Sequence, residues 1–146
     1  MYNKIMQTFL PYKDFRKTAR SLDDKRLFKQ LVEARQIINL ITTGKTKSGR
    51  KYRGFINHPA RFMWEGYPDS LKNYANEILK EIQIRGRTKT SMRLLRTQKI
   101  KNPKWLGNEK FHASHRASLL AKDYEHYKQF NWKEKPKIDY IWPKNN

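Results

Sequence analysis

The chain contains no cysteine, only 13 acidic residues among 146, and no long hydrophobic run. The lack of cysteine excludes disulfides, thiolate zinc sites, iron–sulfur clusters and a cysteine nucleophile. No apolar stretch approaches the roughly 18 residues of a membrane-spanning helix, and the first residues lack the apolar core of a signal peptide. We therefore expect a non-secreted, intracellular protein of the cytoplasm or nucleoid, or of a host cell if the chain is viral, with no membrane partner.

The scarcity of acids leaves a large positive charge. With 33 Lys and Arg residues the formal net charge is +20, while 37% of the residues are hydrophobic and 13% are aromatic. This apolar content is sufficient for a folded core, unlike that of a disordered basic tail. The charge indicates a polyanionic partner, with nucleic acid as the first candidate. An anionic membrane surface is the weaker alternative, because no amphipathic terminal helix is evident.

Length and hydrophobic periodicity predict one compact, all-α domain over residues 1–146, since a chain of this size forms a single core. Apolar side chains recur at steps of three and four within residues 21–41, as on one face of a helix. They are Leu27, Leu31, Ala34, Ile38 and Ile41. Ser21, followed three residues later by Asp24, is expected to cap the start of this helix.

Two further long helices are expected. Residues 69–85 carry a second apolar stripe, and Gly86 is typical of the position just past a helix end. The third covers about 112–128, and its packed side is expected to hold Arg116, Leu119, Leu120, Tyr124 and Tyr127. A shorter helix should start near Pro59, which suits a first helical turn. The fold class is therefore all-α, with about three long helices.

Basic segments and an aromatic tail connect and follow these helices. Residues 44–54 hold five basic residues and three glycines, which predicts a basic loop. Residues 85–104 carry eight basic residues and no acid. Both segments suit contacts with phosphates. The tail, from residue 132 to 143, is expected to be irregular.

One acid within a basic stripe is the main candidate for chemistry. Arg26, Lys29, Gln30 and Glu33 have helical spacings of three, four and seven, which place them on one polar face. A carboxylate on a face that meets phosphates points to catalysis, because a binding module has no need of it. The alternative is an ordinary exposed ion pair between Lys29 and Glu33, which would contribute only a few tenths of a kcal/mol.

The histidines allow several interpretations. His112 and His115 lie three residues apart, and a zinc site is disfavoured because no cysteine and no suitably spaced carboxylate accompanies them. They either donate to phosphates or bases, or form a hydrogen-bonded structural pair. His58 precedes Pro59 and is most simply a helix cap, with a catalytic role as the alternative. We expect no metal and no cofactor.

Aromatic residues alternate with basic ones. Tyr52, Trp105, Tyr140 and Trp142 all lie near Lys or Arg residues, a pattern that favours stacking on unpaired bases. The alternative is that the tryptophans fill a small helical core, and we expect this of Trp64.

Five blocks of residues follow one another along the chain. They are Thr8-Phe9-Leu10-Pro11-Tyr12; Leu22-Asp23-Asp24-Lys25-Arg26-Leu27 with Lys29-Gln30 and Glu33; Asn57-His58-Pro59-Ala60 with Met63-Trp64; His112-Ala113-Ser114-His115-Arg116 with Leu119-Leu120; and Tyr140-Ile141-Trp142-Pro143. In order and spacing they resemble the pyrimidine-dimer DNA glycosylases of the endonuclease V type, most closely their bacterial and viral branch. The resemblance spans roughly residues 7–143.

This resemblance implies a small all-α enzyme that excises a base of a cyclobutane pyrimidine dimer and nicks the strand at the resulting abasic site. The family's essential glutamate maps onto Glu33. The resemblance, together with the basic and aromatic patterns above, gives the expected DNA contacts: Arg26, Lys29, Gln30, His58, Arg61, His112, His115, Arg116, Tyr140 and Trp142. The implied partner is damaged double-stranded DNA, bound by a monomer that needs no cofactor and no obligate protein partner.

The sequence departs from the family at two positions. The family's nucleophile is the amine exposed when the initiator methionine is removed before a small residue, but Tyr2 follows Met1 here. The reacting amine is therefore expected on Met1, or on Met6 if residues 1–6 are an extension. Val32 stands where phage members carry Arg, so another damaged base is an alternative substrate. A non-catalytic DNA-binding protein on the same scaffold is the alternative function, followed by a basic module for RNA or membranes.

Overall fold

The computed structural model describes residues 7–44 and 59–143, which form helices and irregular segments and contain no strand. The elements are α1 (Phe15–Ser21), α2 (Asp24–Thr42), α3 (Pro59–Trp64), α4 (Pro68–Arg85), α5 (Glu109–Lys122), α6 (Tyr124–Tyr127) and a 3-10 turn, η1 (Lys128–Phe130). The all-α prediction is confirmed, and α2, α4 and α5 are the three long helices. None of the described helices is long and apolar enough to span a bilayer.

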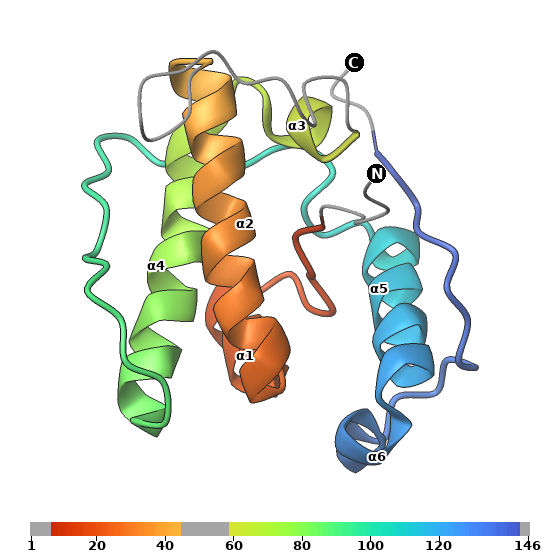
Figure 1. The fold of residues 1–146 in the computed structure, drawn as a ribbon. Helices are drawn as coiled ribbons and strands as arrows, with labels where there is room; N and C mark the ends of the chain where they lie inside the picture. Colours follow the sequence, from red (N-terminus) through yellow and green to blue (C-terminus); the bar gives the residue numbers. More distant parts are fainter. Residues whose placement is uncertain (1–6, 45–58, 144–146) are drawn as a thin grey trace, which may run out of the picture.

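Helices α2 and α4 lie side by side, and α5 stands apart from them across the segment that precedes α1 (Figure 1). The apolar stripes predicted for α2 and α4 meet in the core between these two helices. Trp64 is fully buried, and its ring lies edge-on to that of Trp105, with centroids 5.0 Å apart. The expectation that Trp64 belongs to the core is confirmed.

The predicted cap of α2 was wrong by two residues. Ser21 ends α1, where its hydroxyl donates to the Thr18 carbonyl at 2.7 Å. Asp23 caps α2 instead, and its carboxylate accepts the Arg26 backbone N–H at 3.3 Å. The difference is small because α1 and α2 are separated only by the two extended residues Leu22 and Asp23. The predicted end of α4 is confirmed, since Gly86 has φ 68° and follows its last residue.

The third helix begins and ends earlier than predicted. Asn108 caps α5 by accepting the Phe111 N–H at 3.2 Å. At Asp123 the backbone leaves the helical region with φ −154°, and its carboxylate accepts the His126 N–H at 3.3 Å to open α6. Tyr127 is buried as expected, whereas Tyr124 is 54% exposed and does not belong to the packed side.

The segments between and after the helices are only partly described. The basic loop at 44–54 lies outside the described residues except for Gly44, so that prediction is not tested. Residues 86–104 form no helix. The tail is irregular, as predicted, and lies along α5, where the Lys137 N–H donates to the Ala117 carbonyl at 3.0 Å (Figure 1).

Candidate active site

The segment before α1 lies against α2 through its backbone. The Gln7 N–H donates to Glu33 Oε1 at 3.4 Å, and the Phe9 N–H donates to Gln30 Oε1 at 2.8 Å. The buried Tyr74 hydroxyl of α4 lies 2.7 Å from the same Gln30 oxygen and 2.8 Å from the Phe9 carbonyl oxygen. Burial, and then the negative charge of Glu33, raises the pKa of Tyr74 well above its usual value, so this phenol stays a neutral donor. These contacts hold residues 7–9 against the part of α2 that carries Gln30 and Glu33.

The same segment is held on its other side by two histidines of α5. The Leu10 N–H donates to His115 Nδ1 at 2.9 Å, and the Leu10 carbonyl lies 2.8 Å from His112 Nδ1. The Gly107 N–H donates to His112 Nε2 at 3.0 Å, so His112 carries its proton on Nδ1. Burial lowers the pKa of both rings, that of His115 to about 3. The pair therefore fits the structural alternative stated for it.

Glu33 is the only buried acidic residue, with 8% of its surface exposed; all 13 acids lie within the described ranges. The prediction that Glu33 and Gln30 lie on an open polar face was wrong, since Gln30 is only 1% exposed. Residues 7–10 pack over this part of α2, and helical periodicity cannot reveal a distant segment that covers a face. The exposed Lys29–Glu33 pair considered above does not describe this site.

Basic side chains of two helices interact electrostatically with this carboxylate or with one another. The pKa of Lys122, at the end of α5, is lowered by burial of part of its side chain and by the charges of Arg26 and Lys29, while Glu33 acts in the opposite direction. Burial raises the pKa of Tyr140, with Glu33 acting in the same direction and Arg26 against it. Side chains of α2, α5 and the tail thus interact at one site. Lys122 was not predicted, because only folding brings it to α2.

A family model described as pyrimidine dimer DNA glycosylase matches residues 6–95, more than half of the chain. The chain belongs to the pyrimidine dimer DNA glycosylase family. No curated protein and no solved structure matches it. The matched range includes Arg26, Lys29, Gln30 and Glu33 on α2, whereas Lys122 lies beyond it. The family match and the buried carboxylate therefore converge on the same helix.

The N-cap of α2 orients one of the residues expected to bind DNA in this member of the family. An Arg26 guanidinium nitrogen lies 3.3 Å from the Asp23 carboxylate, which also accepts a hydrogen bond from the Tyr127 hydroxyl. Burial alone would raise the pKa of Asp23, but the hydrogen bond from Tyr127 and the charge of Arg26 lower it below its usual value. Asp23 therefore stays ionised and restrains Arg26 at the start of α2.

The aromatic tail reaches the same region. Tyr140 is half-buried, and its ring centroid lies 5.7 Å from that of His115 and 6.3 Å from that of Phe9. Trp142 follows, with its centroid 5.8 Å from Tyr140. Trp105, by contrast, is buried and donates from Nε1 to the Met63 carbonyl at 3.0 Å, so it belongs to the core and not to a base-stacking surface.

The remaining predicted site residues lie elsewhere or outside the described residues. Arg116 donates to the Pro11 carbonyl at 2.7 Å and pairs with Glu109 and, at 3.0 Å, with Glu134. Arg61 lies 3.7 Å from Glu65 on α3. The positions outside the described residues are Met1, Met6, Tyr52 and His58. The structure thus joins Arg26, Lys29, Gln30, Glu33, Tyr140 and Trp142, adds Gln7 and Lys122, and gives Arg116 internal partners.

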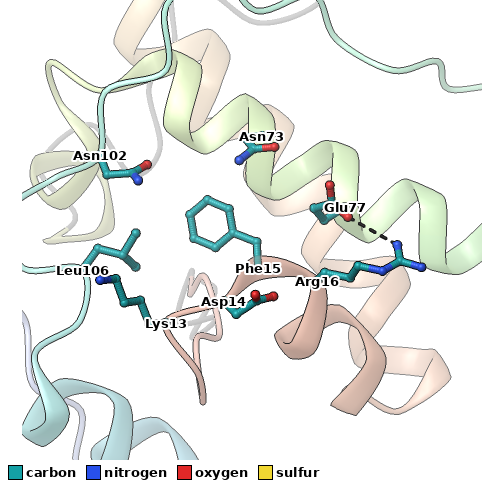
Figure 2. Close-up of a pocket in the computed structure, with 8 residues that line it drawn as sticks. All are labelled: Lys13, Asp14, Phe15, Arg16, Asn73, Glu77, Asn102 and Leu106. Carbon is teal, nitrogen blue, oxygen red and sulfur yellow. Dashed lines mark ion pairs between the residues drawn. The ribbon is translucent and has the colours of Figure 1, made fainter.

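A cavity of about 430 Å³ lies between the start of α1, α4 and residues 102–106 and contains none of these residues. Figure 2 shows the Phe15 ring at its centre, with the amides of Asn73 and Asn102 and the Arg16–Glu77 ion pair around it. Within the described ranges, no group of three or more His, Asp or Glu side chains is arranged to hold a metal ion.

Proposed function

We propose that this protein is a DNA repair glycosylase that excises a damaged pyrimidine, foremost from a cyclobutane pyrimidine dimer, and then nicks the strand at the abasic site. The observation that carries the proposal is the burial of Glu33 on the face of α2 that carries Arg26 and Lys29, where Lys122 interacts electrostatically with all three. Family membership supports it, since the matched range contains this helix. The basic side chains bind phosphates, and the carboxylate faces the sugar of the bound nucleotide.

The chemistry requires a carboxylate at this place. Cleavage of the glycosidic bond builds positive charge on the sugar ring, which a fixed carboxylate stabilises. An amine that attacks C1′ displaces the base, and the sugar ring then opens: the C1′–O4′ bond breaks, O4′ becomes a hydroxyl, and C1′ and the amine nitrogen form an imine. Removal of a proton from C2′ by Glu33 then expels the 3′ phosphate and breaks the strand. The reaction as written needs neither metal nor cofactor.

The reacting amine is proposed to come from the N-terminal segment. The Gln7 N–H already contacts Glu33, so a chain that starts at Met6 would carry its α-amine one residue from this contact. An α-amine has an ordinary pKa near 7.7–8.0, against about 10.4 for lysine, and is therefore far more often neutral near pH 7. Lys122, whose pKa is lowered, is the competing amine at the same site. The full chain would use Met1.

Replacement of Glu33 by Gln tests the function directly. Ultraviolet-irradiated plasmid is incubated with enzyme in the presence of EDTA, and nicked circles are quantified. We expect wild type to nick, and Glu33→Gln to bind irradiated DNA while losing at least about 100-fold in rate, as when a charge-stabilising group is removed. Glu125→Gln, which neutralises an exposed acid on α6, is the matched control and should nick like wild type. Binding without cleavage by wild type would instead establish the non-catalytic alternative.

Borohydride trapping identifies the amine. The full chain, a variant that begins at Met6 and a Lys122→Gln variant are each trapped on abasic-site DNA, and the adduct is mapped by mass spectrometry. We expect the adduct on the α-amine in all three proteins and more of it in the shortened chain. An adduct on Lys122 would reassign the nucleophile, and the absence of any adduct would contradict the strand-nicking step. Defined lesions in short duplexes then establish which damaged pyrimidine is the substrate.

A further inference from the structure

Residues 86–104, here called the basic strap, carry charge far from Glu33. The strap contains seven basic residues and no acid, and all seven side chains are exposed. They are Arg87, Lys89, Arg93, Arg96, Lys99, Lys101 and Lys104. In Figure 1 the first part of the strap runs beside α4 on the side away from α5.

The backbone of the strap is fixed although it has no regular structure. The Asn76 side chain of α4 accepts the Leu95 N–H at 2.7 Å and donates to the Leu95 carbonyl at 2.8 Å. Asp69 Oδ2 accepts the N–H groups of Gln98 and Lys99 at 3.1 and 3.2 Å. These contacts use backbone atoms of the strap and leave its basic side chains directed to solvent. The strap therefore presents its charges from a defined position.

The strap lies on the opposite side of α2 from Glu33. Arg35 donates to the Arg93 carbonyl at 3.2 Å, which places this part of the strap next to Arg35. Residues two apart on a helix point about 200° apart, because each residue turns the helix by about 100°. Glu33 and Arg35 thus face nearly opposite directions, the former toward residues 7–10 and the latter toward the strap.

The start of α2 shows the same division. Asp24 pairs with Arg85 at 2.9 Å and with Arg87 at 2.8 Å, on the side of α4 and the strap. Arg26, two residues later, lies on the Glu33 side, because residues seven apart on a helix share a face. Two positive surfaces are therefore separated by the full width of α2.

Most charges of the strap have no acidic partner. Arg87 pairs with Asp24, and Lys101 lies 5.8 Å from the ring centroid of Tyr67. The other five make no ion pair with any residue that the structure describes: Lys89, Arg93, Arg96, Lys99 and Lys104. A row of uncompensated cations on a fixed backbone matches the regularly spaced charges of a nucleic-acid backbone.

We propose that the basic strap is a second DNA-binding surface, which holds the phosphates of another duplex segment while the Glu33 surface holds the first. One straight duplex cannot contact both, because α2 lies between them. The protein therefore bridges two duplexes, or two distant parts of one DNA molecule. Such a contact is independent of sequence and of damage, since only phosphates are bound.

A capture assay tests the proposal. Short undamaged duplex is immobilised and saturated with protein, unbound protein is washed away, and capture of a second, labelled duplex is measured per bound protein. The test variant combines Lys89→Gln, Arg93→Gln and Arg96→Gln, all on the strap. The matched control combines Lys17→Gln, Lys80→Gln and Lys128→Gln, which removes the same charge from α1, α4 and η1. Neither set alters the backbone contacts of the strap, and circular dichroism checks that each variant folds.

We expect the wild type and the control to capture the second duplex and the strap variant to lose at least fivefold. Nicking of a short lesion-bearing duplex by the strap variant should stay within twofold of the wild-type rate. If the wild type itself does not nick this duplex, only the proposed function is contradicted, because capture is measured on undamaged duplex. Equal capture by the strap variant, or an equal loss in both variants, would overturn the proposal. Preferential competition by duplex RNA or by phosphatidylserine vesicles over duplex DNA would overturn it as well.

Discussion

At the scale of single residues, the segment before α1 depends on two neutral histidines. His115 accepts the Leu10 N–H through Nδ1, so a proton added to this nitrogen would remove the hydrogen bond and place a charge in the core. Burial holds its pKa at about 3, against an ordinary value of 6.5. His112 is shifted in the same direction. Protonation of these histidines at low pH would therefore weaken the attachment of residues 7–10, which cover Glu33.

Unfolding should become easier as the pH falls below about 6.5. Between about pH 6.5 and pH 3, His115 is protonated in the unfolded chain but neutral in the folded chain. The free energy of unfolding therefore decreases as the pH is lowered through this range. One such group contributes a slope of up to about 1.4 kcal/mol per pH unit. Urea denaturation at several pH values between 7 and 4.5 measures this slope.

His115→Asn provides the comparison, because an Asn Oδ1 atom can accept the Leu10 N–H but does not titrate. The variant should be less stable at pH 7 through imperfect packing, yet its stability should fall less steeply with acid, by about one proton. An unchanged slope in the variant would show that other groups cause the loss.

Glu33 illustrates what single residues disclose in a sequence. Its place on the first long helix could be predicted from the spacing of neighbouring residues, and the resemblance to the family implied its role as the essential glutamate. Its burial could not, because the covering residues 7–10 are more than twenty positions away and carry no helical pattern. Lys122 escaped prediction for the same reason, as its relation to Arg26 exists only after α5 packs near α2.

At the scale of elements, the tail is held along α5 by a few polar contacts. Arg116 of α5 binds Glu134 of the tail at 3.0 Å and the Pro11 carbonyl at 2.7 Å. The Trp132 Nε1–H donates to the Tyr12 hydroxyl at 2.8 Å. These contacts join the tail to the segment before α1 and bring Tyr140 against His115. The tail therefore positions an aromatic side chain at the proposed site, while Trp132, Tyr140 and Trp142 pack against the core.

Glu134→Gln should loosen this attachment. Removing the charge weakens the pair with Arg116, so Tyr140 and Trp142 are less often in place to contact damaged DNA. We expect KM for a lesion-bearing duplex to rise about threefold to tenfold while kcat changes less than twofold, which steady-state nicking kinetics would resolve. Lys135→Gln, at an exposed neighbouring position, serves as the control. A fall in kcat with unchanged KM would instead link the tail to the chemical step.

The helix boundaries show where periodicity fails for elements. The third long helix was extended to 128 because Tyr127 has the right spacing, and this residue is indeed buried. The chain reaches that position through a break at Asp123 and a separate turn, α6. A buried residue at helical spacing is therefore compatible with two helices, and only the cap formed by Asp123 distinguishes the two cases.

At the scale of the whole molecule, the acidic residues form ion pairs with some basic side chains and not with others. Asp24, Glu77, Glu81 and Glu134 form ion pairs with arginines of the same chain. The sequence shows that basic residues outnumber acidic ones. It cannot show which basic side chains pair with the acidic ones, because those pairs depend on tertiary contacts. Arg116 was expected to bind DNA and is occupied internally, whereas Lys122 was overlooked and lies at the site.

DNA affinity should consequently depend on salt through particular lysines rather than through net charge. Each phosphate contact contributes about 0.9 to the slope of log affinity against log salt concentration. Lys29→Gln and Lys122→Gln should each lower the slope by about 0.9 for a short lesion-bearing duplex, measured by fluorescence anisotropy between roughly 50 and 200 mM NaCl. Lys80→Gln removes an equal charge, but from a side chain paired with Glu77 at 3.2 Å on α4, and should leave the slope unchanged. If all three variants lowered the slope equally, the charge near Glu33 would be acting only as part of the overall field. A lower slope in Lys29→Gln and Lys122→Gln, with an unchanged slope in Lys80→Gln, would instead assign Lys29 and Lys122 to individual phosphates beside the carboxylate.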